Sequence, residues 1–402
     1  MSKKTINQVD CTGKRVLIRV DFNVPIEDGK ITDDRRIRMA LPTIQAALKK
    51  GAKVILMSHL GRPEGKGYEP GESLKPCAER LAQLLAKPVQ FPSNDCVDAA
   101  AAAAVAAAKP GDVILLDNLR FHKAEKKGDA AFAAKLAAYG DVYVNDAFGT
   151  AHREDASMYA VPAAMAGKPR VVGLLMEKEL RYLSQALANP AKPFMVVLGG
   201  AKVSDKLPLI HNLLKKADQI LIGGAMAYTF LAADGKGVGS SKVETDMIPE
   251  AAKILEESRR SSCKIALPID HVCNTVFAHD SGDIQDFEGQ IKKGYMGLDI
   301  GPATQTDYAT RLYKAKTIVW NGPMGVFEWE PFEVGTLEVA EAIVRATKEH
   351  GAVSIVGGGD SAAAAEQFGL ADKFSHVSTG GGASLEMLEG KPFKTVEILD
   401  NA

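Results

Sequence analysis

RVLIRVDFNVP, residues 15–25, is the stretch that most directly indicates the fold. Its first six residues are mostly aliphatic or β-branched, which favours a buried strand. The strand runs into a polar segment closed by Pro25. In open α/β sheets, ligands bind beyond the carboxyl ends of the strands. We therefore expect Asp21 and Asn23 to lie at a binding edge.

The same alternation of short aliphatic runs and longer helix-favouring segments continues along the chain. In the first half, runs at 15–20, 53–59 and 112–118 each precede a helical segment, at 39–51, 73–86 and 130–140. The second half repeats it with FMVVLGG (194–200), QILIGGA (219–225), KIALPID (264–270), TIVWNGP (317–323) and AVSIVGGGD (352–360). Such alternation is typical of βα units. It predicts an α/β protein with two doubly wound parallel-sheet (Rossmann-like) domains, joined by an interdomain helix and hinge.

The length of 402 residues also favours two domains, because single hydrophobic cores stop growing below that size. A helical segment at 174–189 ends at Asn189-Pro190, and we place the boundary near Pro190. The predicted parts are an N-terminal domain over 1–173, the interdomain helix over 174–189 and a C-terminal domain over 190–387. The alanine run at 99–108 predicts a surface helix without chemistry.

Composition limits the class of protein. The chain is 46% hydrophobic and 25% charged with a formal net charge of -1, so it has no overall attraction to nucleic acid or to an anionic membrane. We expect no signal peptide and no membrane span. The five cysteines are scattered and never in C-x-x-C spacing, which suggests neither disulfides nor a zinc site and fits a reducing cytoplasm. They are expected to be unreactive, without a base or metal pattern beside them: Cys11, Cys77, Cys96, Cys263 and Cys273.

Polar and basic side chains collect at the predicted strand ends of the first half. Of 15 arginines, 11 precede Pro190. Arginine binds phosphate and carboxylate oxygens bidentately, so side chains from separate loops predict a site for a small polyanion. The candidates are Asp21, Asn23, Arg36, His59, Arg62, Arg120 and Arg153. Taken singly, each has an ordinary alternative as a turn former, a strand-end histidine or a solvated helix start.

The second half instead carries three glycine-rich loops of a phosphate-binding type. LGGAKVSDK (198–206) is expected to put Lys202 and Lys206 at the opening of a helix, where free N–H groups favour an anion. VGGGDSAAAAEQFG (356–369) adds Asp360, an oxygen ligand of the kind Mg²⁺ prefers, and STGGGASLEMLEG (378–390) repeats the pattern without the acid. These loops predict a nucleotide polyphosphate with magnesium. The P-loop, dinucleotide and protein-kinase motifs are all missing from the sequence.

Seven motifs together resemble one known family. RVDFNVP, SHLGRP, LRFH, GTAHR, GGAKVSDK, WNGPMGVFE and GGGDSAAA, in this order, are similar to the phosphoglycerate kinases over nearly the whole chain. The resemblance implies reversible phosphoryl transfer between 1,3-bisphosphoglycerate and ADP, giving 3-phosphoglycerate and ATP, in glycolysis and gluconeogenesis. It assigns the seven polar candidates above to the triose site. It assigns to the nucleotide and its magnesium Gly200, Lys202, Lys206, Gly223, Gly224, Leu298, Asn321, Pro323, Val326, Glu328, Gly358, Gly359, Asp360 and Ser361, with Asp360 as the metal ligand.

The chemistry implied needs positioning and charge compensation more than a general base, since a carboxylate acceptor is already ionised. We assign the compensation to Arg36 and Lys202, as the catalytic residues. Domain closure is expected to exclude water, with hinges at the helix of 174–188 and at 378–382. The resemblance also implies that residues 388–402 return to the N-terminal domain, and that the protein is a cytoplasmic monomer without nucleic-acid or membrane partners.

Two other classes share parts of this pattern. A periplasmic-type binding protein also clamps an anion between two α/β lobes, and a nicotinamide-dependent dehydrogenase also has doubly wound sheets. The phosphate-binding residues Lys202 and Asp360 argue against the first. The absent dinucleotide motif argues against the second.

Overall fold

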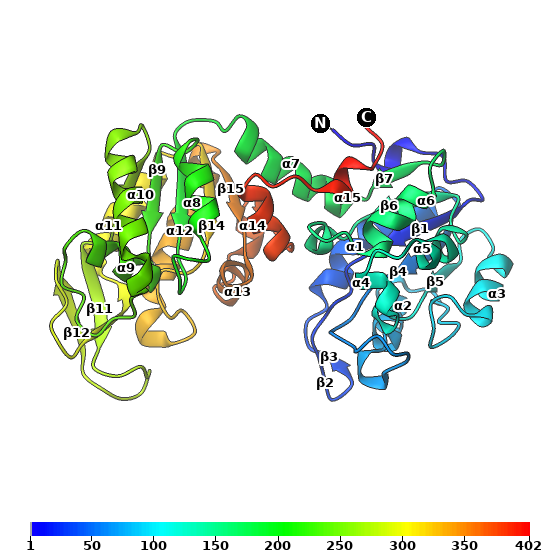
Figure 1. Ribbon diagram of the computed structural model, residues 1–402, viewed down its shortest axis with the longest axis horizontal. Coiled ribbons are helices and arrows are strands. Elements are labelled where there is room, and N and C mark those ends of the chain that lie inside the picture. The colour runs from blue at the N-terminus through cyan, green and yellow to red at the C-terminus, as the bar shows by residue number, and fades with distance from the viewer. Residues whose placement is uncertain (1) are drawn as a thin grey trace. The chain divides into compact units, whose positions relative to one another are not determined.

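The chain folds into two compact α/β units (Figure 1). The computed structural model describes residues 2–402, apart from the side chains of residues 185–187. Unit 1 comprises Met1–Arg181 and Pro392–Ala402, and unit 2 comprises Tyr182–Lys391. The division falls inside helix α7 (Leu174–Ala188), which ends just before Asn189-Pro190. The C-terminal segment of unit 1 forms a short helix, α15 (Lys394–Glu397).

Unit 1 is built on a five-stranded parallel sheet with the order β5-β4-β1-β6-β7. Its strands are β1 (Arg15–Arg19), β4 (Lys53–Met57), β5 (Val113–Leu115), β6 (Val142–Asn145) and β7 (Arg170–Val172). Its other helices are α1 (Arg35–Lys49), α2 (Lys75–Leu85), α3 (Ala99–Ala107), α4 (Lys123–Lys126), α5 (Ala130–Ala137) and α6 (Val161–Ala164). A small hairpin pairs β2 (Ile26–Glu27) with β3 (Lys30–Ile31). The strand order reverses between β1 and β6, which makes that junction the switch point where such sheets bind ligands.

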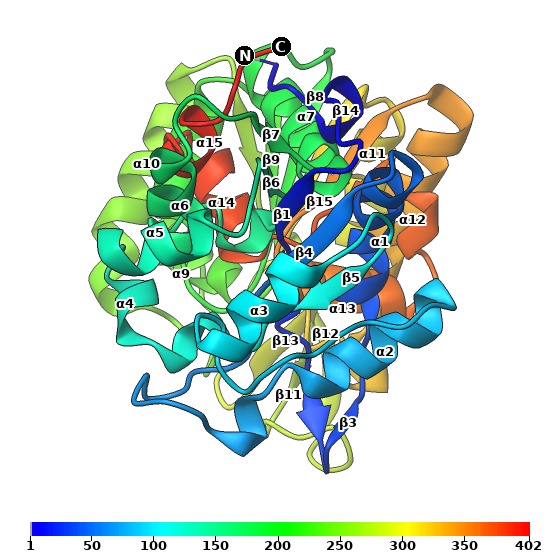
Figure 2. The same cartoon turned by 90° about the vertical axis from the view of Figure 1, so that its right-hand side faces the viewer.

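Helical layers cover the sheet of unit 1 (Figure 2). Figure 2 shows α1 and α2 to one side of the strands and α5 and α6 to the other. Alternate residues of β1 explain this, since Val16 and Ile18 are fully buried in one core with Ile37 and Ile44 of α1. Leu17, between them, points to the opposite face and is also fully buried. Burial on both faces is what a doubly wound parallel sheet requires.

Unit 2 repeats the same topology with one more strand, in the order β10-β9-β8-β14-β15-β16, and all these pairs are parallel. The strands are β8 (Phe194–Leu198), β9 (Gln219–Ile222), β10 (Lys264–Ala266), β14 (Thr317–Asn321), β15 (Val353–Val356) and β16 (His376–Val377). The helices are α8 (Leu207–Leu214), α9 (Met226–Ala233), α10 (Ile248–Arg260), α11 (Pro302–Tyr313), α12 (Val334–His350), α13 (Gly359–Gln367) and α14 (Gly382–Leu388). Here the switch point lies between β8 and β14. The predicted doubly wound parallel-sheet class is therefore confirmed for both units.

Unit 2 also contains a three-stranded antiparallel sheet that the sequence did not predict. It pairs β11 (Asp270–Asn274) with β12 (Ile284–Glu288) and β13 (Met296–Ile300). The expectation of one strand over 264–270 was wrong, because β10 ends at Ala266 and Asp270 already belongs to β11. Pro268 stands between them and has no N–H to continue a strand ladder. Among the described helices, none combines the length and apolar character that a membrane crossing needs.

Candidate functional site

The loop after β1 forms the first part of the site in unit 1. Asp21 pairs with Arg36 at the start of α1, with Nη1 and Oδ2 3.1 Å apart. Asn23 accepts a hydrogen bond from the Gly61 N–H at 2.8 Å, which joins the loops after β1 and β4. The loops after β1 and β4 are thus tied together near the switch point, and Asp21 and Asn23 lie just beyond the end of β1.

His59 is a buried histidine that several arginines of unit 1 affect electrostatically. It is 2% exposed, and burial lowers its pKa well below the usual value. Positive charge from Arg19, Arg120, Arg153 and Arg36 acts in the same direction. Both effects favour the neutral ring of His59. Which ring nitrogen carries the hydrogen then depends on the contact with Arg19.

Arg19, at the end of β1, is a residue that the sequence analysis missed. It is fully buried, its Nη2 lies 3.1 Å from His59 Nδ1, and its Nε donates to Ser157 Oγ at 2.8 Å. A guanidinium only donates, so Nδ1 of the neutral ring accepts and Nε2 carries the hydrogen. Buried Glu125 in turn accepts from the Ser157 N–H at 3.0 Å and from Oγ at 2.5 Å. This network holds His59 as a hydrogen-bond donor.

Arg120 and Arg153 line a pocket of about 500 Å³ in unit 1. The Arg120 side chain is held by the Gly61 carbonyl at 2.9 Å and lies 3.8 Å from Asp155. Its Nε is buried without a hydrogen-bond partner among the described residues. Lys126 and Lys127 complete the basic lining and were not predicted. The lining thus holds four cationic side chains against two carboxylates, Glu154 and Asp155, and the unpaired Arg120 N–H is free to bind an anion there.

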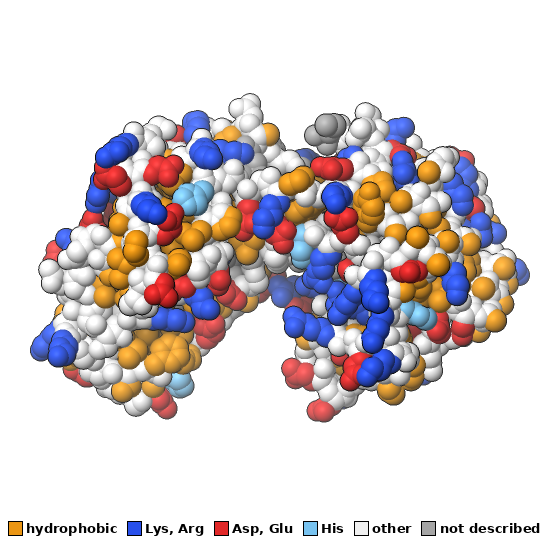
Figure 3. Space-filling model, in the orientation of Figure 1, with side chains coloured by type: hydrophobic (Ala, Val, Ile, Leu, Met, Phe, Trp, Pro, Cys, Tyr) orange, Lys and Arg blue, Asp and Glu red, His pale blue; other side chains and the backbone are white. Residues whose placement is uncertain are grey.

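Six of the seven predicted side chains of this unit are therefore linked by contacts or by mutual electrostatic effects. The seventh, Arg62, is exposed next to Gly61, and we find no hydrogen bond or ion pair for it within residues 2–402. Figure 3 shows lysine and arginine side chains gathered on one face of unit 1, the right-hand body in that view.

Unit 2 presents backbone groups at its own switch point. The Gly199 N–H donates to the Asn321 carbonyl at 3.0 Å, and the Gly200 N–H donates to the Pro323 carbonyl at 3.1 Å. Gly224, with φ of +65°, approaches so closely that an added Cβ would lie 2.6 Å from the Gly200 nitrogen. The loops after β8, β9 and β14 thus form one glycine-lined wall that a side chain would block.

Asn321 connects this wall to the first turn of α13. Its Oδ1 accepts a hydrogen bond from Lys206 Nζ, and its Nδ2 donates to the Gly357 carbonyl at 2.7 Å. Ser361 Oγ accepts from the Gly322 N–H at 2.5 Å. Gly358 has φ of +94°, and an added Cβ would meet Asn321 Nδ2 at 2.8 Å.

The prediction that Lys202 and Lys206 open a helix was wrong in part. α8 begins at Leu207, so Lys206 holds the N-cap position while Lys202 lies in the preceding loop and is exposed. Burial lowers the Lys206 pKa, and nearby Asp360 acts in the opposite direction. Pro208 explains the late start, because proline is favoured only in the first turn of a helix.

A pocket of about 530 Å³ joins the glycine wall to the antiparallel sheet of unit 2. Its lining includes seven predicted residues: Gly200, Gly224, Leu298, Pro323, Val326, Glu328 and Asp360. Gly223 lies behind the wall, where an added Cβ would meet Met324 Sδ at 2.4 Å. Ser240, Lys242 and Phe277 also line the pocket and were missed, since none of them lies in the three glycine-rich loops that the sequence singled out. The pocket is apolar at Leu298 and Phe277 and carries a carboxylate at Asp360.

Two carboxylate-containing groups bear on metal binding. Asp360 is exposed in the first turn of α13 and lines the pocket, which suits a single protein ligand to a magnesium ion that also binds phosphates. The second group corrects the prediction that no cysteine has a base or metal pattern beside it. All five cysteines are buried, but Cys96 lies beside Asp95 and His122.

Known proteins resemble this chain over its whole length. A family model described as phosphoglycerate kinase matches residues 6–391. The phosphoglycerate kinase of Rhodopirellula baltica is 54% identical over 405 residues, and the match covers 100% of both chains. That of Thermosipho africanus is 54% identical over 402 residues, and the match covers 100% of this chain and 98% of the relative. The solved structure of phosphoglycerate kinase from Coxiella burnetii superposes with a TM-score of 0.89 at 40% identity, covering 98% of each chain. The chain therefore belongs to the phosphoglycerate kinase family, a family of phosphotransferases.

Proposed function

We propose that this chain transfers a phosphoryl group reversibly between 1,3-bisphosphoglycerate and ADP, giving 3-phosphoglycerate and ATP. One observation carries the proposal: two units with the same strand order present different anion-binding groups at equivalent switch points. Unit 1 offers guanidinium and imidazole side chains, and unit 2 offers glycine backbone beside Lys206 and Asp360. The first chemistry suits a small phosphorylated acid, and the second suits a nucleotide polyphosphate.

In unit 1 the triose acid would bind among the basic side chains. We assign this role to Asp21, Asn23, Arg36, His59, Arg62, Arg120 and Arg153. The neutral His59, with its hydrogen on Nε2, would donate to an oxygen of the substrate without adding a charge that varies near neutral pH. Arg120 and Arg153 line a pocket wide enough for a phosphate group. Asp21 would hold Arg36 in position through their ion pair.

In unit 2 the nucleotide would occupy the pocket that runs from Leu298 and Phe277 to Asp360. The apolar end suits the base, and the glycine wall and the first turn of α13 suit the phosphates. Lys202 and Lys206 would neutralise phosphate charge. Asp360 would hold magnesium, which supplies charge neutralisation at the phosphates when it is bound.

The reaction needs orientation and charge compensation, because a carboxylate acceptor requires no general base. We assign the compensation to Arg36 and Lys202, which come from different units. The two units must then close over both substrates, and closure would also keep water from the acyl phosphate. We place the hinge in α7 and at 378–382. In this scheme residues 1–173 with 388–402 form the triose-binding domain, and 190–387 form the nucleotide-binding domain.

A coupled assay with ATP, Mg²⁺ and 3-phosphoglycerate tests the activity. We expect ADP formation that depends on all three components, whereas a binding protein or a dehydrogenase would give none. An assay at rising chelator concentration adds a check on magnesium, since activity should fall and return with added Mg²⁺. We further propose that the protein acts as a monomer in the cytoplasm. Free cysteines and a relative from Trypanosoma congolense named as a cytosolic phosphoglycerate kinase, 49% identical over 417 residues, support the location.

A further inference from the structure

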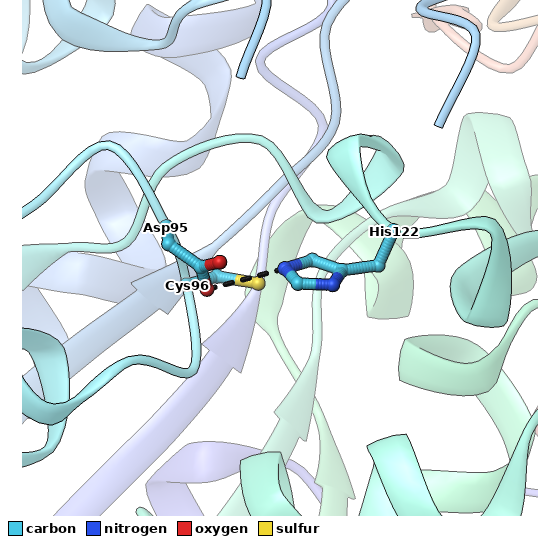
Figure 4. A group of neighbouring side chains, drawn as sticks. All are labelled: Asp95, Cys96 and His122. Atoms are coloured by element: carbon cyan, nitrogen blue, oxygen red, sulfur yellow. Dashed lines mark hydrogen bonds and ion pairs between the residues drawn. The ribbon is translucent and has the colours of Figure 1, made fainter. Parts of the chain in front are cut away.

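Three side chains with different metal-binding atoms meet on unit 1 (Figure 4). Asp95 and Cys96 come from the loop before α3, and His122 directly follows the 3-10 helix η3 (Leu119–Phe121). A carboxylate oxygen, the cysteine sulfur and a ring nitrogen all lie within 4.8 Å of one another. It is the one such group of three among residues 2–402, and none of its members has a role in the proposed reaction.

The spacing of these atoms is close to what a tetrahedral ion needs. Bonds of about 2.0–2.3 Å from zinc to oxygen, nitrogen and sulfur put neighbouring ligand atoms roughly 3.3–3.7 Å apart. Asp95 Oδ1 already lies 3.1 Å from His122 Nε2. The His122 ring is also packed against Phe132, with centroids 5.0 Å apart, which limits its rotation. Small side-chain shifts would therefore suffice to bring all three atoms onto one ion.

The electrostatic surroundings favour a cation. Three acidic side chains, Asp95, Asp117 and Glu125, lie near enough to Cys96 to act on it electrostatically. Their negative charge would attract a divalent ion, and the ion would in turn compensate a cysteine thiolate bound to it. Asp95 and His122 side chains are 40% and 28% exposed, so an ion can enter from solvent and keep a water as its fourth ligand.

We propose that Asp95, Cys96 and His122 form a binding site for a thiophilic divalent cation, with zinc as the ion that fits best. Binding converts the Cys96 thiol to a metal-bound thiolate and releases its proton to solvent, so affinity rises with pH. Magnesium prefers an all-oxygen shell and would not compete for this site. The site is thus chemically distinct from the magnesium position proposed at Asp360.

Cobalt(II) titration of the full chain, without an affinity tag and after treatment with a chelator, tests the proposal. Cobalt takes zinc sites and reports a thiolate ligand by a near-ultraviolet charge-transfer band. We expect one equivalent of Co²⁺ to produce that band together with visible bands of tetrahedral intensity, and Zn²⁺ to displace it. The Cys96→Ser variant should lose the charge-transfer band, and Asp95→Asn should weaken binding by more than an order of magnitude.

Cys77→Ser is the matched control, because Cys77 is equally buried in the same unit but belongs to no group of metal-binding side chains among the described residues. It should keep the full cobalt signal. Circular dichroism of each variant separates loss of the site from loss of the fold, and Asp95→Asn keeps the Oδ1 that accepts a hydrogen bond from the Val97 N–H. A folded wild-type chain without the charge-transfer band, or an equal band in Cys96→Ser, would overturn the proposal.

Discussion

Arg36 is the residue on which the proposed transfer step most depends. Its side chain is 35% exposed and pairs with Asp21, so its removal should leave the core of unit 1 intact. Arg36→Ala should lower kcat by about 10³ or more, by analogy with the arginine residues that stabilise other phosphoryl-transfer transition states. Steady-state kinetics in the coupled assay measures this change.

Arg38 provides the control on the same helix. It is more exposed and pairs with Asp34 four residues before it. Arg38→Ala should change kcat less than about twofold and stability by less than about 1 kcal/mol, as is usual for a surface ion pair. Near-normal turnover of Arg36→Ala, or an equal loss in both variants, would remove Arg36 from the transfer step.

The position of a residue, as distinct from its role, could be predicted where a side chain closely follows a strand. Asp21 and His59 each lie two residues beyond the end of a strand, and the parallel sheet brings them to one edge. Arg19 was missed because it sits inside an aliphatic run, where alternation suggests packing alone. Its role depends on Ser157 and Glu125, which are distant in the chain and reach it only in the folded unit.

At the scale of elements, Asp146 fixes the beginning of α7. Its Oδ1 accepts hydrogen bonds from the N–H groups of Leu175 at 3.0 Å and Met176 at 3.1 Å, and burial raises its pKa to about 6. Asp146→Ala leaves these helix N–H groups without their acceptor and should destabilise unit 1 by about 1–3 kcal/mol.

Differential scanning calorimetry can measure the change in Tm for this variant. Asp146→Asn keeps the Oδ1 acceptor, so it should lose much less stability than Asp146→Ala. If the alanine variant melts at the wild-type temperature, the carboxylate does not hold α7.

Asp299 on β13 makes unit 2 sensitive to pH. It accepts hydrogen bonds from the N–H of Gly335 at 2.6 Å and of Ile300 at 2.8 Å. Burial nevertheless raises its pKa to about 8. A folded pKa above the unfolded value means that the folded state holds the proton more tightly. The stabilisation from this group is complete below about pH 4 and is lost as the pH rises to about 8, with a slope of at most ~1.4 kcal/mol per pH unit.

Urea unfolding at pH 5 and pH 8, followed by tryptophan fluorescence, tests this dependence. The protein has two tryptophans, Trp320 and Trp329, and both belong to unit 2. Asp299→Asn should reduce the difference in unfolding midpoint between the two pH values, while Asp286→Asn on exposed β12 should not. An unchanged difference in the Asp299 variant would contradict the assignment.

Elements were predicted well where their periodicity was strong and poorly where it was weak. Most strands of the two parallel sheets are buried aliphatic runs that stand out in the sequence, whereas the short β7 and β16 were not predicted. β12 is largely exposed and rich in polar residues, so it lacks the pattern of a core strand. Its pairing with β11 forms only in the folded unit. Because this antiparallel sheet was not predicted, the pocket residue Phe277, which follows β11, was missed as well.

For the whole molecule, the proposed mechanism requires the two units to approach each other when both substrates are bound. Small-angle X-ray scattering should show a smaller radius of gyration with 3-phosphoglycerate and the nucleotide together than with either alone. A non-hydrolysable ATP analogue keeps the ternary complex from turning over. An identical radius of gyration for the free protein, the two binary complexes and the ternary complex would argue against closure.

The central claim is that unit 1 binds the triose acid through side chains and unit 2 binds the nucleotide. Isothermal titration calorimetry of 3-phosphoglycerate and of Mg-ADP against wild type, Arg153→Ala and Lys206→Ala tests it most directly. Arg153→Ala should weaken 3-phosphoglycerate binding at least tenfold, about 1.4 kcal/mol or more, and leave the affinity for Mg-ADP unchanged. Lys206→Ala should weaken Mg-ADP binding to a similar extent and leave the affinity for 3-phosphoglycerate unchanged. Equal weakening of both ligands in each folded variant would contradict this division between the units.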